Sequence, residues 1–137
     1  KNREVRDNLQ KEIVITIIII TFIIMGNIVT QNNTKNAVEI MSMQLDSIKE
    51  EILPKNKNEE NLKEKLDLIE KTWEEKYKTL AYYIEHEELE KVETEITKLR
   101  ANLFTKEYEV AVENIDTCNF ILTHIKDKSA LKIVNIF

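Results

Sequence analysis

The 137-residue chain has very little of the residue types that turn a backbone or cross-link it: one glycine, one proline and one cysteine. Hairpins and tight turns use glycine and proline, so their scarcity argues against sheets and predicts an all-α fold. A single glycine also excludes glycine-rich phosphate-binding loops and the nucleophile elbow of hydrolases. The lone cysteine, Cys118, cannot form an internal disulfide, and its place among apolar residues at helical spacing predicts a small buried side chain.

Short catalytic and metal-binding motifs are also missing. The chain has no Cys-x-x-Cys pair, and His86-Glu87 begins a His-Glu-x-x-His zinc motif that fails because Glu90 stands where the second histidine belongs. Neither histidine has a glutamate three residues before it, as di-iron helical bundles require. We therefore predict no catalytic residue, no cofactor and no metal site. The many carboxylates are expected to lie on solvated helix faces.

Acidic residues outnumber basic residues in the larger part of the chain. Residues 31–137 contain 16 Lys and Arg against 22 Asp and Glu, a net charge of −6. Binding to nucleic acid rests on the neutralisation of phosphates by basic side chains. We therefore expect no nucleic-acid partner.

One long hydrophobic run is present, Ile13–Met25, and no charged residue occurs from Ile13 to Asn33. The 17 residues of Ile13–Val29 are just long enough to cross the hydrocarbon core of a bilayer as a helix. We expect a transmembrane anchor over residues 13–30, preceded by a short segment, 1–12, and followed by one helical domain, 31–137. A cleaved signal peptide and a buried core helix are the alternatives, although no Ala-x-Ala-like cleavage site follows the run.

Basic residues are distributed unequally around this run. Four precede it and two occur in the twenty residues from Gln31 to Glu50: Lys1, Arg3, Arg6 and Lys11, then Lys35 and Lys49. Basic residues flanking a membrane span stay in the cytoplasm. The bias predicts a single-pass protein of the cell membrane, with residues 1–12 in the cytoplasm and residues 31–137 outside.

Four segments after the run repeat apolar residues at intervals of three and four, which is typical of amphipathic helices. They are Val38–Ile52, Leu62–Ile84, Leu89–Leu103 and Ala111–Ile125. Together they predict an antiparallel bundle of about four helices. Acidic residues gather after Glu85 and favour a helix start there, so we place a break near Glu85. A continuous helix over residues 60–104 is the alternative.

The apolar positions of the last two segments match when the sequence is reflected about residue 105, which predicts an antiparallel helical hairpin. The reflection places Val92 opposite Cys118, with a turn at Phe104–Lys106 and Thr105 as the N-cap of the last helix. The apolar tail, residues 131–137, is expected to pack along the bundle. Among the aromatic residues, Trp73 lies on an apolar stripe, whereas Tyr82 points away and is expected to face solvent or a partner.

The two histidines, His86 and His124, fall at the same level of this hairpin. With Glu87 nearby they are the weak candidates for a metal or pH-responsive site. The helical wheel places them on opposite flanks, since His86 lies about 100° and His124 about 140° from the apolar stripe of its own helix. Structural roles, such as closing a helix end, are therefore the expectation.

The sequence also resembles a known family through several short elements. These are Tyr83–Leu89, Val92-Glu93, Leu122–Ile125, Leu131–Ile133 and the closing Asn135-Ile136-Phe137. They are similar to a domain of unknown function in Gram-positive bacteria, a family of small membrane-anchored helical proteins, over about residues 73–137. The motif positions are His86, Glu87, Glu88, His124, Asn135 and Phe137. Relatives often carry Asp at the position of Glu85 and Pro at that of Lys126. The resemblance implies no known activity and supplies no catalytic residue.

Two classes of function follow from the sequence. The first is a membrane-anchored helical module outside the cytoplasm that binds another protein, for which an integral membrane protein is a candidate. The second is a sensor or enzyme with a cryptic site around His86 and His124. The absence of motifs favours the first class.

Overall fold

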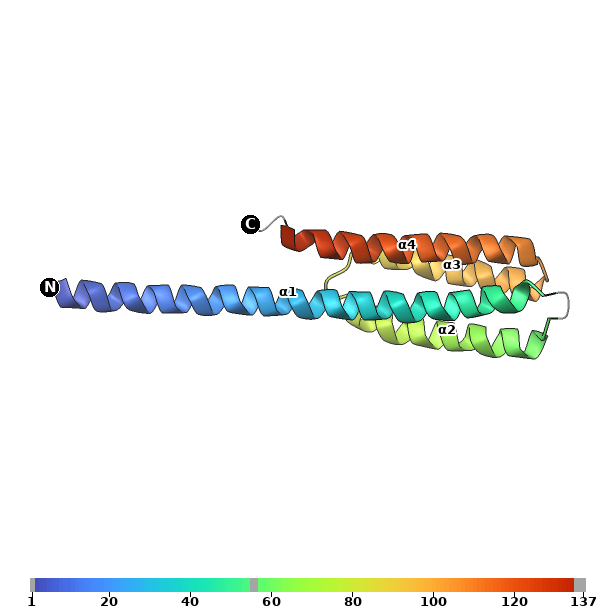
Figure 1. Cartoon of the computed structure of the whole chain (residues 1–137), viewed down its shortest axis with the longest axis horizontal. Helices are drawn as coiled ribbons and strands as arrows, with labels where there is room; N and C mark the ends of the chain where they lie inside the picture. The colour runs from blue at the N-terminus through green and yellow to red at the C-terminus, as the bar shows by residue number, and fades with distance from the viewer. Residues whose placement is uncertain (1, 55–56, 135–137) are drawn as a thin grey trace.

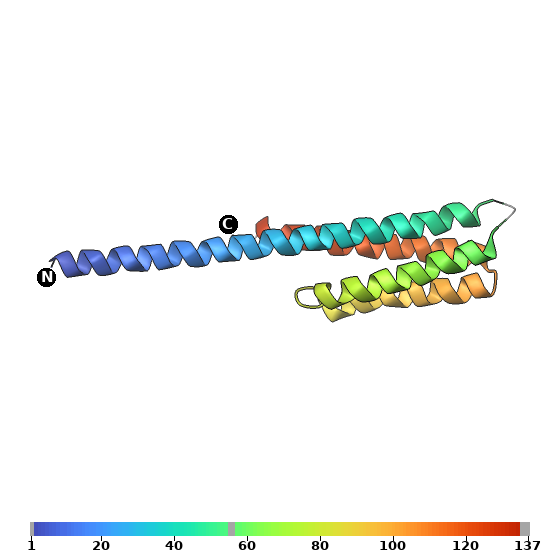
Figure 2. The same cartoon turned by 90° about the horizontal axis from the view of Figure 1, so that it is seen from below.

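The computed structural model describes residues 2–54 and 57–134, and these residues form four helices and no strand. The helices are α1 (Asn2–Ile52), α2 (Glu59–Leu80), α3 (His86–Phe104) and α4 (Tyr108–Val134). Consecutive helices run antiparallel and pack side by side as a bundle (Figures 1 and 2). The predicted all-α bundle is therefore confirmed.

The longest element, α1, joins the apolar run to the first helix of the bundle without a break. Its N-terminal half extends beyond the other helices, and its C-terminal half packs between α2 and α4 (Figure 1). The polar residues 31–36 that separate the two halves are helical. Thr34 is already buried there, and its hydroxyl donates to the carbonyl of Thr30 one turn back. With no proline or glycine in this stretch, nothing interrupts the helix.

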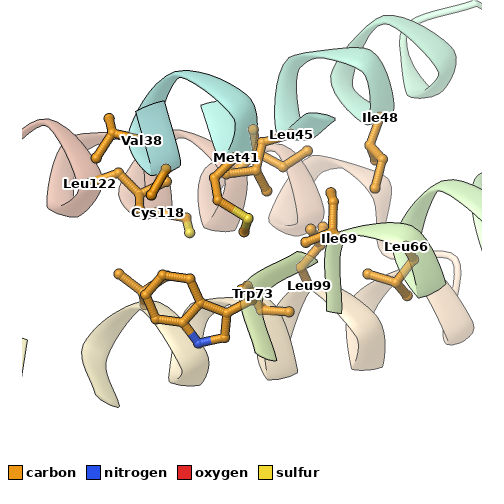
Figure 3. Packing of buried hydrophobic residues seen from close by; sticks show 14 of the residues in the cluster. Val38, Met41, Leu45, Ile48, Leu66, Ile69, Trp73, Leu99, Cys118 and Leu122 are labelled. Atoms are coloured by element: carbon orange, nitrogen blue, oxygen red, sulfur yellow. The ribbon is translucent and has the colours of Figure 1, made fainter. Parts of the chain in front are cut away.

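The core lies between the four helices and uses the apolar stripes seen in the sequence. Figure 3 shows Met41 of α1, Trp73 of α2, Leu99 of α3 and Cys118 of α4 turned toward one another. Each is at most 4% exposed. The stripes of Val38–Ile52, Leu62–Leu80 and the two later helices supply the remaining buried hydrophobic side chains. Burial of these stripes, and not helix propensity alone, is what stabilises helices of this length.

Helices α2 and α3 are separated by a turn at the place that the sequence predicts. α2 ends at Leu80, a turn follows, and Glu85 is the extended N-cap of α3 (φ −61°, ψ 131°). The alternative of one continuous helix is therefore wrong. Ile84, which was expected to close the second helix, lies in the turn, with its N–H bonded to the carbonyl of Leu80 at 2.8 Å. At its other end α2 is capped by Asn58, whose side chain accepts from the N–H of Asn61 at 3.1 Å.

The link between α3 and α4 corrects the predicted cap. Thr105 is the C-cap of α3 and not the N-cap of α4. The N–H of Glu107 donates to the carbonyl of Asn102 (2.8 Å) and that of Lys106 to the carbonyl of Leu103 (3.3 Å), the two bonds of a Schellman motif. Lys106 takes the left-handed conformation of this motif (φ 61°). That position usually holds glycine. The reversal itself lies within Phe104–Lys106, so the predicted place of the turn is confirmed.

The antiparallel pairing of α3 with α4 is confirmed by bonds between them. Asn114 of α4 donates from Nδ2 to Glu95 Oε2 of α3 at 3.0 Å. The predicted reflection about residue 105 places Glu95 opposite residue 115, one residue from Asn114. Val92 and Cys118 are both fully buried in the shared core. Their direct contact stays a prediction.

Candidate interaction surfaces and the His-Glu-Glu corner

The first candidate surface is the apolar half of α1. Ile17, Phe22 and Ile24 are between 42% and 71% exposed, and the most apolar stretch of the helix has no buried residue. The hydroxyls of Thr16 and Thr21 donate to carbonyls one turn back, each at 2.8 Å, so they are satisfied without water. By length and composition this is the one described helix that could cross a membrane, and a signal sequence has the same character.

The second candidate surface is a groove between α2 and α3 at the end of the bundle farthest from the N-terminus. It has a volume of about 950 Å³ and is lined by the start of α2 and the end of α3. Leu62, Leu66 and Leu103 form its apolar wall, and Phe104 stands beside it with 87% of its surface exposed. An exposed aromatic side chain next to an apolar hollow is the usual composition of a protein-binding surface.

Charged side chains of both signs surround this groove, and ion pairs hold most of them in place. Arg100 of α3 forms ion pairs with Asp67 (2.8 Å) and Glu70 of α2. The hydrogen bonds that Arg100 donates to Glu70 and then to Asp67 raise the pKa of Arg100 above its ordinary value. Lys106 pairs with Glu59, which raises the pKa of Lys106. Because these charges satisfy one another, they fix the shape of the rim of the groove.

The corner between α2 and α3 contains His86. The Nδ1 atom of His86 lies 3.2 Å from the hydroxyl of Tyr77, which joins the first turn of α3 to the last turn of α2. Tyr77 in turn packs edge-on against Trp73, with ring centroids 6.0 Å apart. His86 is thus tied to the core through two aromatic rings, although its own side chain is exposed.

The other residues of the predicted site do not gather around His86. Lys128 of α4 lies 3.2 Å from a carboxylate oxygen of Glu85 and 3.8 Å from one of Glu88, while Glu87 pairs with Lys91 on its own helix. Within residues 2–54 and 57–134, no three His, Cys, Asp or Glu side chains form a group that could hold a metal ion.

The remaining motif positions lie on α4 and beyond it. His124 is exposed on α4. Asn135 and Phe137 lie outside the described residues, and so does the end of the apolar tail that was expected to pack along the bundle.

One polar cluster outside the predicted site residues is buried between α3 and α4. Glu95 is 8% and Asn114 9% exposed. Lys98 donates to Glu95 Oε1 at 2.7 Å, Asn114 donates to Glu95 Oε2, and Asn102 donates to Asn114 Oδ1 at 2.6 Å. Both carboxylate oxygens of Glu95 therefore accept a hydrogen bond, which offsets the cost of burying this charged group.

Cys118 lies close to this cluster and is 1% exposed. Burial, with a smaller contribution from the charge of Glu95, raises the pKa of the Cys118 thiol to about 12. The thiolate is therefore absent at neutral pH. The prediction that Cys118 is a small buried side chain is confirmed.

These features define a class of protein: a four-helix bundle whose first helix extends beyond the bundle and contains an exposed apolar run, Ile13–Met25. The chain belongs to a family described as a domain of unknown function (DUF4363), which matches residues 28–136. The match includes the whole bundle and begins near the end of the apolar run, so it is wider than the region of residues 73–137 that carries the motifs. No curated protein and no solved structure matches the chain.

Proposed function

We propose that the protein is a non-catalytic membrane-anchored module that holds a protein-binding groove at a fixed distance from a bacterial cell membrane. The observation that carries the proposal is the continuity of α1, whose exposed apolar half and packed half form one helix (Figure 2). A flexible linker would let the bundle move freely, whereas a single helix fixes its height and direction. From Gln31 to Ile52 the helix rises about 30 Å, which sets the distance of the groove from the membrane.

The direction of insertion follows from the basic residues. Four precede the apolar segment and two occur in the twenty residues from Gln31 to Glu50, so we assign the short N-terminal segment to the cytoplasm and the bundle to the outer side. The net charge of −6 on residues 31–137 agrees with a domain that does not bind the anionic inner surface of the membrane.

The groove between α2 and α3 is the proposed binding site for a protein, for which an integral membrane protein is the favoured candidate. Its apolar wall and the exposed ring of Phe104 suit an amphipathic helix with a large apolar anchor residue. The paired charges of the rim, Arg100 with Glu70 and Lys106 with Glu59, would select the partner by its charge pattern. The groove contains no histidine and no cysteine, which supports binding over catalysis.

Site-specific crosslinking in intact membranes tests this proposal. A photo-crosslinking amino acid replaces Phe104 in the full chain, and the crosslinked species are identified by mass spectrometry. We expect one dominant crosslinked protein. Ala101→Trp places a bulky ring in the groove from an exposed position and should abolish that crosslink.

Thr94→Trp is the matched control, because Thr94 is exposed on the same face of α3, two turns before Ala101, and does not line the groove. The crosslink should persist in this variant. A crosslink that is equally strong in both variants would show that the groove is not the binding site. Extraction of the full chain from membranes by alkaline carbonate would show that the protein is not anchored.

A further inference from the structure

The end of the bundle that faces the N-terminal half of α1 is formed by the α2–α3 turn and the last turns of α4 (Figures 1 and 2). Tyr82 lies in the α2–α3 turn with 89% of its surface exposed, the highest value for an aromatic side chain in the described part of the chain. Its neighbour Tyr83 points the other way, and its hydroxyl lies 3.5 Å from Thr34 Oγ1 of α1. The turn is therefore held at the height of Thr34.

The height of Thr34 above the apolar segment can be worked out along α1. Ile13–Val29 rises about 25 Å at 1.5 Å per residue, whereas a hydrocarbon core is about 30 Å thick, so a centred segment places the edge of the core near Gln31. The headgroup layer adds about 5–7 Å on each side, which reaches Thr34. Tyr82 thus lies at the height of the lipid headgroups.

α4 reaches the same height along the neighbouring side of α1. The side-chain amide of Gln31 donates to the carbonyls of Ser129 at 3.4 Å and Ala130 at 3.5 Å, so these two residues lie level with the edge of the hydrocarbon core. The α4 backbone continues to Val134, about 6 Å beyond Ala130 in the same direction and so past that edge.

We propose that this end of the bundle is itself a lipid-binding surface, at which the ring of Tyr82 reaches the lipid headgroups. A tyrosine ring has an apolar body and a polar tip, and such rings gather where acyl chains meet headgroups. Two contacts with the bilayer, from α1 and from the α2–α3 turn, then keep the bundle upright. This inference rests on the proposed membrane anchor.

Tryptophan scanning in vesicles tests the inference. The full chain is reconstituted into phosphatidylcholine and phosphatidylglycerol vesicles whose acyl chains carry bromine, which quenches nearby indole rings. The two variants are Tyr82→Trp and Phe104→Trp, aromatic exchanges at positions that are 89% and 87% exposed at opposite ends of the bundle. The wild-type chain supplies the signal of Trp73, the single tryptophan, for subtraction. Because position 82 lies at an interface whichever way the chain inserts, mixed orientation does not affect the result.

We expect the indole introduced at position 82 to emit at shorter wavelength and to lose about twofold in intensity in brominated vesicles, while that at position 104 is unchanged. If the chain floats with the vesicles but the indole at position 82 is quenched no more than that at position 104, the inference is wrong and the turn is free for a protein partner. If the chain does not float with the vesicles at all, the proposed anchor fails, and this inference fails with it.

Discussion

The buried bond between Glu95 and Asn114 allows a sharp test of the α3–α4 interface. Asn114→Asp replaces a donor by a second carboxylate at the position where the present bond is 3.0 Å long. Two unit charges at that distance repel by about 5 kcal/mol at an effective dielectric constant of 20. Lys98 stays in contact with Glu95 and offsets part of this repulsion, so we expect a loss of about 3 kcal/mol in the free energy of unfolding.

The assay is urea unfolding of the full chain in mild detergent, followed by the fluorescence of Trp73. That side chain is the single tryptophan and is 4% exposed in the bundle core, so the signal reports the bundle and not the apolar half of α1. Thr117→Asp adds the same charge at an exposed position of α4 and should change stability by less than about 0.5 kcal/mol.

A second substitution and the pH dependence complete this test. Glu95→Gln should restore most of the stability of the Asn114→Asp variant, because it removes one of the two charges. Protonation of either carboxyl group also removes the repulsion, so the folded chain holds this proton more tightly than the unfolded chain. The variant should therefore approach wild-type stability in acid and lose it as the pH rises. Wild-type stability of Asn114→Asp at neutral pH, or no rescue by Glu95→Gln, would refute the arrangement.

Four further outcomes are expected. Val92→Asp places a charge at a position that is 0% exposed and should lower the free energy of unfolding by about 3–5 kcal/mol in the same urea assay. The melting temperature of Lys106→Gly should be several degrees higher than that of Lys106→Ala, because both variants lose the ion pair at the groove but only glycine adopts the positive φ without strain. The Cys118 thiol should stay unmodified by Ellman's reagent in the folded chain and react once the chain is unfolded in urea. His86→Ala should cost about 1 kcal/mol through loss of the bond to Tyr77, and zinc should not raise the melting temperature of either chain, since a ligand of the folded state would stabilise it.

The sequence predicted the parts of the fold that follow from periodicity. Val38, Leu66, Ile96 and Leu122 were placed on apolar stripes, and all four are buried. The break near Glu85 was also predicted, because the end of one stripe and a cluster of acidic residues coincide there. Both signals are local, so a single sequence is enough to read them.

The remaining features depend on geometry that a stripe does not encode. The place of the turn at Phe104–Lys106 was predicted, but its left-handed lysine was not, because that position of a Schellman motif usually holds glycine. The groove arises from the spacing of α2 and α3 at one end of the bundle, which no motif marks. Glu95 did leave a signal: it stands three residues after Val92 and four before Leu99, on the stripe itself, so a charged residue at that position indicates a buried polar contact.

The central claim, an anchored bundle on the outer side of a cell membrane, is tested most directly by cysteine labelling in intact bacterial cells. Phe104→Cys and Asn8→Cys place exposed thiols in the bundle and before the apolar segment, and the buried Cys118 of the wild-type chain supplies the unlabelled control. With a membrane-impermeant maleimide, we predict labelling of the Phe104→Cys chain in intact cells and of the Asn8→Cys chain only after permeabilisation. The reverse pattern, or labelling of both chains only after permeabilisation, would contradict the account.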